Sequence, residues 1–499
     1  MSSLKIHNNQ VVDEKSIPEL PYDLFREINI SMMDNHPERH CVMYFGYPDN
    51  GMIRLICCIA DDTEHNISIS SARIKAGSSL NSFTAGNLNF EKFEREISEN
   101  HGISYVDHPW LKPVRYSENR FDRNNKIENY PFFNIESDEL HEVGVGPVHA
   151  GIIEPGHFRF ICNGEQILHL EIQLGYQHRG VEYLFLKKKK LIQKAVLSES
   201  IAGDSVVEHA SAFAYLWENL SGFQSGQEIL FARTLAQEIE RIAIHTGDLS
   251  AICTDVAYQL GSSVFGRLRT PIINFFQEWC GNRLAKGLIR PGYNPFTFNI
   301  TLANRLNEVL SAFEPDFIEM NGELSKLPSS LSRFERTGTL TYDQILEIGT
   351  VGMSARINAL IRDVRLSHPY GLYASRKHEP IIKHHGDVYS RVQLRKEEVL
   401  QSISYVRELI KNVPEPDKDC FKQMPLRPDS FALTMTEGWR GEVCHAAITN
   451  GSGELVVYKV KDPSFHNWLA LALAVRNNEI SDFPVCNKSF DLSYCGHDL

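Results

Sequence analysis

The stretch from residue 146 to 183 concentrates side chains that could carry acid–base chemistry. It reads GPVHAGIIEPGHFRFICNGEQILHLEIQLGYQHRGVEY, and its middle alternates between apolar and polar residues as β-strands do. Glu154 and His157 are close in sequence, and carboxylate and imidazole groups have pKa values on either side of neutrality that burial shifts. The pair could therefore relay protons. The alternative is a buried, hydrogen-bonded pair that only fixes the loop.

Four further polar residues complete this stretch: His149, His178, Arg179 and Glu182. Either histidine could touch a substrate or line a proton path, but histidines in Gly-rich turns also bond to the backbone. Arg179 and Glu182 could pair beside a cavity, position a partner's cofactor, or form a structural salt bridge. Polar chemistry on a tight β-ribbon indicates a buried site or an interface, and the residues alone leave open whether a reaction occurs there.

The helices and strands that must position these groups can be predicted from the sequence pattern, and together they indicate an α+β fold. The chain has 499 residues, enough for two or three domains. Residues 1–116 predict a small α/β domain with a hairpin at the Pro-Asp-Asn-Gly turn and a helix that ends at Gly102. Residues 117–142 are rich in Asn, Asp, Glu and Ser and predict a linker. Residues 143–499 predict a mainly helical domain with β-ribbons at its ends.

Composition excludes several classes of function. The net charge of −12 argues against nucleic-acid partners. The N-terminus has no apolar signal region, and no run of about 18 apolar residues predicts a membrane span. The ten cysteines are scattered without a CxxC pair, which predicts reduced, mostly buried thiols and no metal-binding framework.

Further motifs follow the opening stretch in order: GNRLAKGLIRPG (281–292), GTVGMSARINALIRDVRLSHPYGLY (349–373), GDVYSRVQLRKEE (386–398), EGWRGE (437–442) and KDPSFHNW (461–468). Together they resemble the large subunit of group 4 [NiFe] hydrogenases of the formate hydrogenlyase type, and equally the related forty-nine-kilodalton subunit of respiratory complex I. FEREISENHGI and HPWLKPVRY resemble the thirty-kilodalton subunit of complex I. The chain therefore resembles a fusion of these two complex I subunits.

The resemblance also implies where this sequence departs from the hydrogenases. Their nickel–iron centre needs four soft thiolate ligands in two CxxC pairs. The corresponding positions in this sequence are Ala202, Ser205, Ser493 and Gly496. Cys495 is one residue out of register, so we expect no metal site. The tail also offers Cys495, His497 and Asp498, too few ligands for a zinc site.

This sequence also departs from the complex I subunit, at the positions that contact quinone in that family. The family's quinone-facing histidine corresponds to Ile153, and its quinone-contacting tyrosine is missing from the segment VLSESIAG. A quinone, if one binds, would use other groups.

Three residues outside the opening stretch are further cavity candidates. Asp204 and His209 could help to form a proton-conducting or water-filled cavity, or Asp204 could cap the helix predicted to begin near Ser205. By resemblance, Arg356 lines the cavity that faces a neighbouring cluster, where a guanidinium could tune its potential or hold an anion.

The resemblance implies partners rather than a cofactor bound by this chain. We expect an iron–sulfur small subunit of the twenty-kilodalton type, which carries a [4Fe–4S] cluster, and an antiporter-like membrane arm, at the cytoplasmic face of the inner membrane. The expected function is that of a peripheral-arm subunit of a complex I-like, energy-converting oxidoreductase without a NiFe centre. The alternatives are a catalytically silent coupling subunit and an NADH:quinone oxidoreductase-type subunit with an altered quinone cavity.

Overall fold

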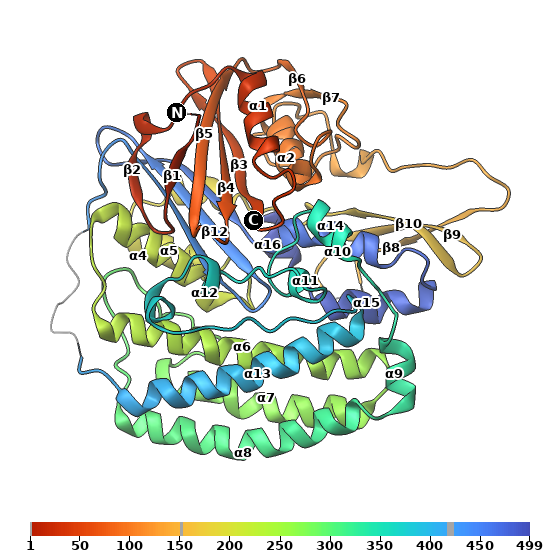
Figure 1. Ribbon diagram of the computed structural model, residues 1–499, viewed down its shortest axis with the longest axis vertical. Helices are drawn as coiled ribbons and strands as arrows, with labels where there is room; N and C mark the ends of the chain where they lie inside the picture. Colours follow the sequence, from red (N-terminus) through yellow and green to blue (C-terminus); the bar gives the residue numbers. More distant parts are fainter. Residues whose placement is uncertain (1, 150–152, 417–423) are drawn as a thin grey trace.

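The computed structural model describes residues 2–149, 153–416 and 424–499 of the chain. Part of the opening stretch, at 150–152, and Cys420 lie outside the described residues. The fold is α+β, as the sequence predicts, with the N-terminal sheet on one side and a bundle of long helices on the other (Figure 1).

The N-terminal region is built on a four-stranded sheet in the order β1-β5-β4-β3. Its strands are β1 (Leu4–Ile6), β3 (Arg39–Asp49), β4 (Met52–Asp61) and β5 (Asn66–Ile74). The predicted hairpin is confirmed, because Asn50 and Gly51 both have positive φ between β3 and β4, as tight hairpin turns require. The predicted helix is α2 (Glu91–His101), and Gly102 ends it with φ 70°. The other elements of this region are α1 (Tyr22–Ser31), β6 (Ser79–Asn81) and β7 (Ser104–Val106).

A second four-stranded sheet joins the two ends of the chain. Its order is β13-β12-β11-β2, so the N-terminal strand β2 (Val11–Asp13) pairs with the C-terminal strand β11 (Ser430–Glu437). The remaining strands are β12 (Glu442–Thr449) and β13 (Leu455–Lys461). This pairing ties the N-terminal region to the C-terminal one through backbone hydrogen bonds.

The opening stretch forms a three-stranded antiparallel ribbon in the order β10-β9-β8. Its strands are β8 (His141–Val145), β9 (His157–Asn163) and β10 (Gln166–Gln173). The ribbon projects from the body of the molecule in Figure 1. Phe158 and Phe160 anchor its inner face by packing against Phe483 in the C-terminal segment. The alternation of apolar and polar residues in this stretch is therefore explained by a sheet with one buried face.

The helical bundle consists of five long helices with a shared apolar core. They are α5 (Val206–Ser221), α6 (Gln227–Asp255), α7 (Gln259–Cys280), α8 (Ile300–Leu324) and α13 (Val388–Leu409). All five lie where the 3.6-residue periodicity predicts them. No helix in the described ranges is long and apolar enough to cross a membrane.

Shorter helices connect the bundle to the ribbon and sheets. They are α3 (Val181–Lys187), α4 (Leu191–Ser198), α9 (Pro328–Phe334), α10 (Tyr342–Glu347), α11 (Met353–Arg356), α12 (Val364–Ser367), α14 (Ser464–Ala474), α15 (Phe483–Phe490) and α16 (Tyr494–Asp498). Helix α16 brings the tail of the chain back to the base of the ribbon, where Tyr494 contacts Phe158.

Candidate functional site

A cavity of about 320 Å³ lies where three distant segments meet. We call it the tail cavity. The loop before β9, the loop before α5 and the C-terminal segment line it, together with one residue from the β11–β12 turn. Its lining residues are Ile153, Glu154, Gly203, Asp204, Arg440, Asn487, Lys488, Asp491, Leu492, Ser493, Tyr494 and Cys495. The cavity thus joins the opening stretch to both segments in which metal ligands were expected to be missing.

Arg179 holds two of these segments together. Its guanidinium donates hydrogen bonds to the carbonyl oxygens of Ser200 (2.6 Å), Ile201 (2.8 Å) and Cys495 (2.9 Å). The planar donor fork of arginine suits this task, because one side chain can bind several fixed acceptors. Arg179 is therefore a structural clamp between the loop before α5 and the tail.

Glu154 also contacts the tail. One carboxylate oxygen accepts a hydrogen bond from the backbone N–H of Cys495 at 3.1 Å. Burial, and then the negative charge of Glu154, raise the pKa of the Cys495 thiol to about 12. The thiol therefore stays protonated at neutral pH, and a protonated thiol is a poor nucleophile and a poor metal ligand.

Arg440 lies in the wall of the tail cavity and pairs with carboxylates from two segments. It forms a bidentate ion pair with Asp204 (2.8 and 2.5 Å) and approaches the Asp491 carboxylate at 3.9 Å. Lys488 makes a second pair with Asp491 at 3.0 Å. These four side chains, which we call the cavity ion pairs, neutralise one another in a site where unpaired charges would be costly.

The capping interpretation of Asp204 is wrong. Helix α5 begins after Ser205, and no side chain at that position caps it. The carboxylate of Glu240 instead accepts hydrogen bonds from the N–H groups of Val207 (2.9 Å) and Glu208 (3.3 Å). Asp204 is thereby left free to pair with Arg440.

The four positions expected to have lost metal ligands are all buried. Ala202 and Ser205 lie just before α5, and the Ser205 hydroxyl accepts a hydrogen bond from Arg440 at 3.2 Å. The Ser493 hydroxyl caps α16 by accepting the N–H of Gly496 at 2.9 Å. Among the described residues, no group of three or more His, Cys, Asp or Glu side chains is placed to hold a metal ion.

Glu154 and His157 do not contact each other through any hydrogen bond found in the described ranges. The Nδ1 of His157 faces the carbonyl of Gly146 at 3.1 Å, and its ring packs against Phe132. Burial lowers the pKa of this imidazole. The two groups therefore do not form the fixed pair considered as an alternative, and the proton relay remains a prediction.

The other two histidines of the opening stretch bond to backbone carbonyls. His149 Nε2 lies 2.8 Å from the carbonyl oxygen of Gly156, and His178 Nδ1 lies 2.7 Å from that of Asp498. This is the structural alternative stated for them. Both rings fix turns next to the tail cavity and are absent from its lining.

Glu182 and Arg356 also have partners other than those expected. Glu182 pairs with Lys459 at 2.7 Å and accepts the N–H of Val460, so the expected pair with Arg179 does not form. Arg356 has no exposed surface and bonds to Glu398 at 2.7 Å. This guanidinium is the main attractive charge that holds the pKa of the Glu398 carboxyl well below its usual range. Arg356 thus belongs to a buried ion network and not to the lining of the tail cavity.

Sequence reasoning missed the residues that fill the tail cavity with charge, Arg440, Lys488 and Asp491. Arg440 could have been found from the sequence, because it lies in the EGWRGE motif.

Sequence reasoning also gave no indication of a buried chain of hydrogen bonds next to the tail. In that chain Asp462 contacts His209 (3.1 Å), His209 contacts His445 (3.1 Å), and His445 contacts Tyr458 (2.8 Å).

Comparisons with known proteins agree with this architecture. Residues 259–430 match the family described as "Respiratory-chain NADH dehydrogenase, 49 Kd subunit". Hydrogenase-4 component G of Escherichia coli is 27% identical over 387 residues, which cover 78% of this chain and 67% of the relative. The carbon monoxide-induced hydrogenase of Rhodospirillum rubrum is 27% identical over 355 residues, 70% of this chain and 97% of the relative.

A third relative extends the comparison to the quinone oxidoreductases. The C/D polypeptide of the NADH-quinone oxidoreductase of Bacteroides thetaiotaomicron is 25% identical over 401 residues, 74% of this chain and 75% of the relative. The chain is thus related to the family that joins this complex I subunit and the hydrogenase large subunits. The match to a fused C/D polypeptide supports an N-terminal region like the thirty-kilodalton subunit of complex I.

Proposed function

We propose that this chain is a peripheral-arm subunit of a membrane-associated, complex I-like oxidoreductase, and that it lacks a NiFe centre. One observation carries the proposal: the tail cavity contains the cavity ion pairs where a hydrogenase would need thiolates. Electron transfer by the complex would be coupled to ion translocation. The cluster that delivers electrons would lie on an iron–sulfur partner of the twenty-kilodalton type, and an antiporter-like membrane arm would anchor the assembly at the cytoplasmic face.

The donor set of the tail cavity does not fit nickel. A nickel–iron centre requires soft, deprotonated sulfur ligands. The aligned positions offer hydroxyl groups at Ser205 and Ser493, a methyl group at Ala202 and no side chain at Gly496. The one thiol in the lining, Cys495, is held protonated. Two of the hard carboxylates in the lining, those of Asp204 and Asp491, are already engaged by Arg440 and Lys488.

If a substrate such as a quinone enters the tail cavity, Glu154 is the group best placed to exchange a proton with it. Glu154 lines the cavity, and its carboxylate accepts a hydrogen bond from the backbone N–H of Cys495. A carboxylate is one of the side-chain groups that can act as a general acid or base towards a bound substrate. His157, the first residue of β9, would be the other candidate for this proton exchange.

A second candidate function is supported by the same geometry. Asp204 and Asp491 are each paired with a cation of the cavity wall, so neither offers a free charge to a substrate. A cavity that satisfies its own charges suits a subunit that transmits conformational or protonic changes without catalysis. In this case the tail cavity would be a structural joint between the ribbon and the bundle.

Metal analysis of the purified complex tests the proposal directly. We expect iron from the partner's cluster and no stoichiometric nickel. One nickel per copy of this chain would overturn the absence of a NiFe centre.

Electron transfer to quinones, with ion transport measured in vesicles, then separates the two candidates. Loss of quinone reduction in Glu154→Gln, with Glu165→Gln from the exposed ribbon turn as the matched control, would support the catalytic role. Ion transport without reduction of any acceptor would support the silent subunit.

A further inference from the structure

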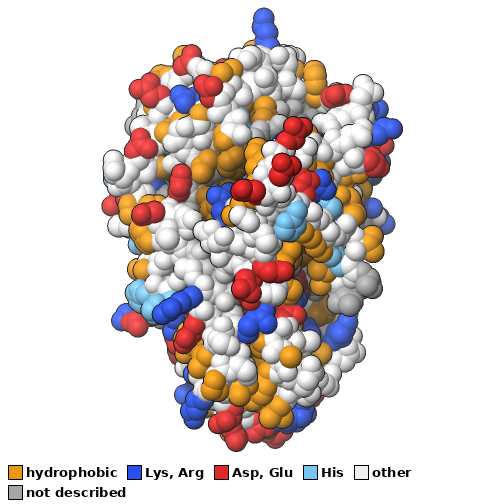
Figure 2. Space-filling model, turned by 90° about the vertical axis from the view of Figure 1, so that its right-hand side faces the viewer, with side chains coloured by type: hydrophobic (Ala, Val, Ile, Leu, Met, Phe, Trp, Pro, Cys, Tyr) orange, Lys and Arg blue, Asp and Glu red, His pale blue; other side chains and the backbone are white. Residues whose placement is uncertain are grey.

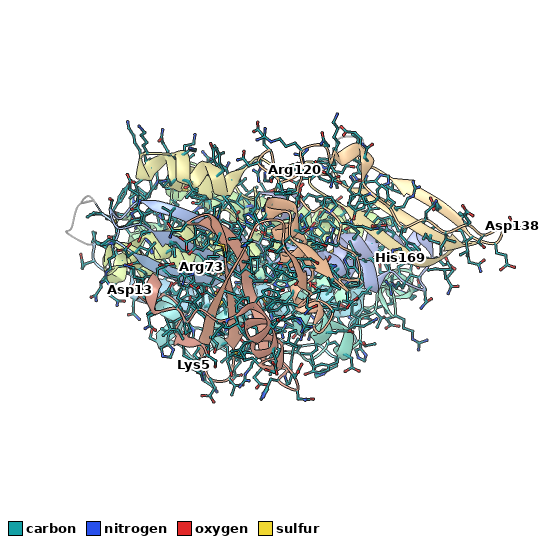
Figure 3. All side chains as sticks on the ribbon, turned by 90° about the horizontal axis from the view of Figure 1, so that it is seen from above. Lys5, Asp13, Arg73, Arg120, Asp138 and His169 are labelled. Atoms are coloured by element: carbon teal, nitrogen blue, oxygen red, sulfur yellow. The ribbon has the colours of Figure 1, made fainter. Side chains whose placement is uncertain are left out.

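A second cavity, of about 350 Å³, lies between the N-terminal region and the tail. We call it the interdomain pocket. It is lined by α2, by residues 109–114 after β7, by two residues of the segment before β8, by β10, by α14 and by His497 of the tail. Its volume falls within the range of small-molecule sites, about 300–1,000 Å³. His169, on β10, belongs to its lining and is labelled in Figure 3.

Four aromatic rings line the interdomain pocket: Trp110, Tyr130, Phe133 and Trp468. The indole N–H of Trp110 donates to the carboxylate of Glu91, which fixes that ring. Trp468 is buried, whereas Phe133 is 51% exposed. Rings from both sides of the pocket suit a flat apolar molecule, because aromatic faces stack on such a ligand.

The lining of the interdomain pocket has more cationic than anionic side chains. Its lining has four cations and two carboxylates, in a chain whose net charge is −12. Arg95 pairs with Glu91, and Lys112 pairs with Glu171. In the described part of the chain, the two remaining cations, Lys92 and Arg476, have no carboxylate within ion-pair distance. Figure 2, which looks onto the side with the β8–β10 ribbon, shows hydrophobic, basic and histidine side chains close together, with acidic side chains beside them.

Lys92 is a half-buried cation of this lining. Burial lowers the pKa of its ammonium group to about 7. Arg95 and Arg115 also disfavour its charge, while Glu91 and Asp498 favour it. Its ammonium lies 5.8 Å from the ring centre of Phe465. A ligand with a negative charge would supply the ion-pair partner that Lys92 lacks.

We propose that the interdomain pocket binds a flat aromatic anion, such as an aryl carboxylate, with its ring between the aromatic side chains and its acid group at Lys92. Such a ligand matches the pocket in shape, apolar surface and charge. The pocket lies next to the tail cavity, because the indole of Trp468 donates a hydrogen bond to the carbonyl of Ser493 at 3.3 Å.

Calorimetric titration of the purified full-length chain with naphthalene-2-carboxylate tests the proposal. We expect one site, and about tenfold weaker binding of the neutral naphthalene-2-carboxamide, because a charge-assisted hydrogen bond is lost. Affinity for the carboxylate should fall as the pH rises above about 7, because Lys92 then loses its proton. Equal binding of the acid and the amide would overturn the anion preference.

Two variants make the residue assignment testable. Lys92→Met should weaken carboxylate binding about tenfold and abolish its pH dependence. Lys5→Met, which changes a lysine of β1 far from the pocket, should leave binding unaltered. If Lys92→Met does not fold, Lys92→Gln tests the same charge with the acid–amide comparison. Unchanged affinity in folded Lys92→Met, or no binding by the unaltered chain, contradicts the proposal.

Discussion

Gly496 lies directly against the carboxylate of Asp462. A Cβ added at Gly496 would be 2.6 Å from Oδ2 of Asp462, closer than real Cβ contacts allow. The same oxygen faces Nε2 of His209 at 3.1 Å, so its position is set from the other side. The space that a longer side chain at 496 would need is therefore occupied by a buried, hydrogen-bonded carboxylate.

Gly496→Cys should destabilise the chain rather than provide a metal ligand. Insertion of a side chain into a packed site costs about 1–3 kcal/mol, and here it would also disturb the contact between Asp462 and His209. Chemical denaturation measures the effect. Gly451→Ala is the matched control, because its added Cβ meets nothing closer than 3.6 Å. Equal stability of Gly496→Cys and the unaltered chain would show that Asp462 can move.

Arg440→Lys should destabilise the tail cavity by about 2 kcal/mol. Lysine keeps the charge but cannot form the bidentate contact with Asp204 or reach Ser205 at the same time. The control is Arg267→Lys, because the pair of Arg267 with Asp316 is well exposed and such pairs contribute about 0–1 kcal/mol. A comparable loss in both variants would mean that the cavity pair is no more important than a surface pair.

Cys495 should react slowly with iodoacetamide at pH 7.5, because its thiol pKa is about 12. Glu154→Gln should accelerate the reaction, since it removes a negative charge that raises this pKa. The pKa should still remain elevated, because burial is the larger cause. Mass spectrometry of the modified tail peptide over a pH series measures the rate. An unaltered rate–pH profile in Glu154→Gln would rule out electrostatic contact between the two groups.

Asp498 should make the stability of the chain depend on pH between about 4 and 6. Burial raises the pKa of its carboxyl to about 6 from an ordinary value of 3.8. The folded state therefore holds this proton more tightly than the unfolded state. Its contribution is full below about pH 4 and is lost as the pH rises through 6. The linked loss is up to about 3 kcal/mol, at about 1.4 kcal/mol per pKa unit.

The variant Asp498→Asn isolates this effect in denaturant unfolding. It should gain stability relative to the unaltered chain as the pH rises from 4 to 6, with no further change above pH 7. Asp138→Asn, at an exposed position in the loop before β8, serves as the control and should show no such trend (Figure 3). A pH-independent difference between Asp498→Asn and the unaltered chain would contradict the raised pKa.

The sequence by itself determined those elements whose signals are local. The turn at Asn50–Gly51, the end of α2 at Gly102 and the five long helices each follow from residues within one hairpin or one helical face. The ribbon that opens the second half was also visible, because its strands alternate.

Tertiary structure decided the partners of the charged side chains. Asp204 could cap α5 by sequence, but Arg440, 236 positions away, takes its carboxylate while Glu240 binds the helix terminus. Proximity in sequence likewise did not bring Glu154 and His157 together. One bonds to the tail and the other to Gly146. A charged side chain pairs with whichever partner the packed backbone brings within about 3 Å. Distances between residues far apart in the chain are set by the tertiary packing, so they cannot be read from one sequence.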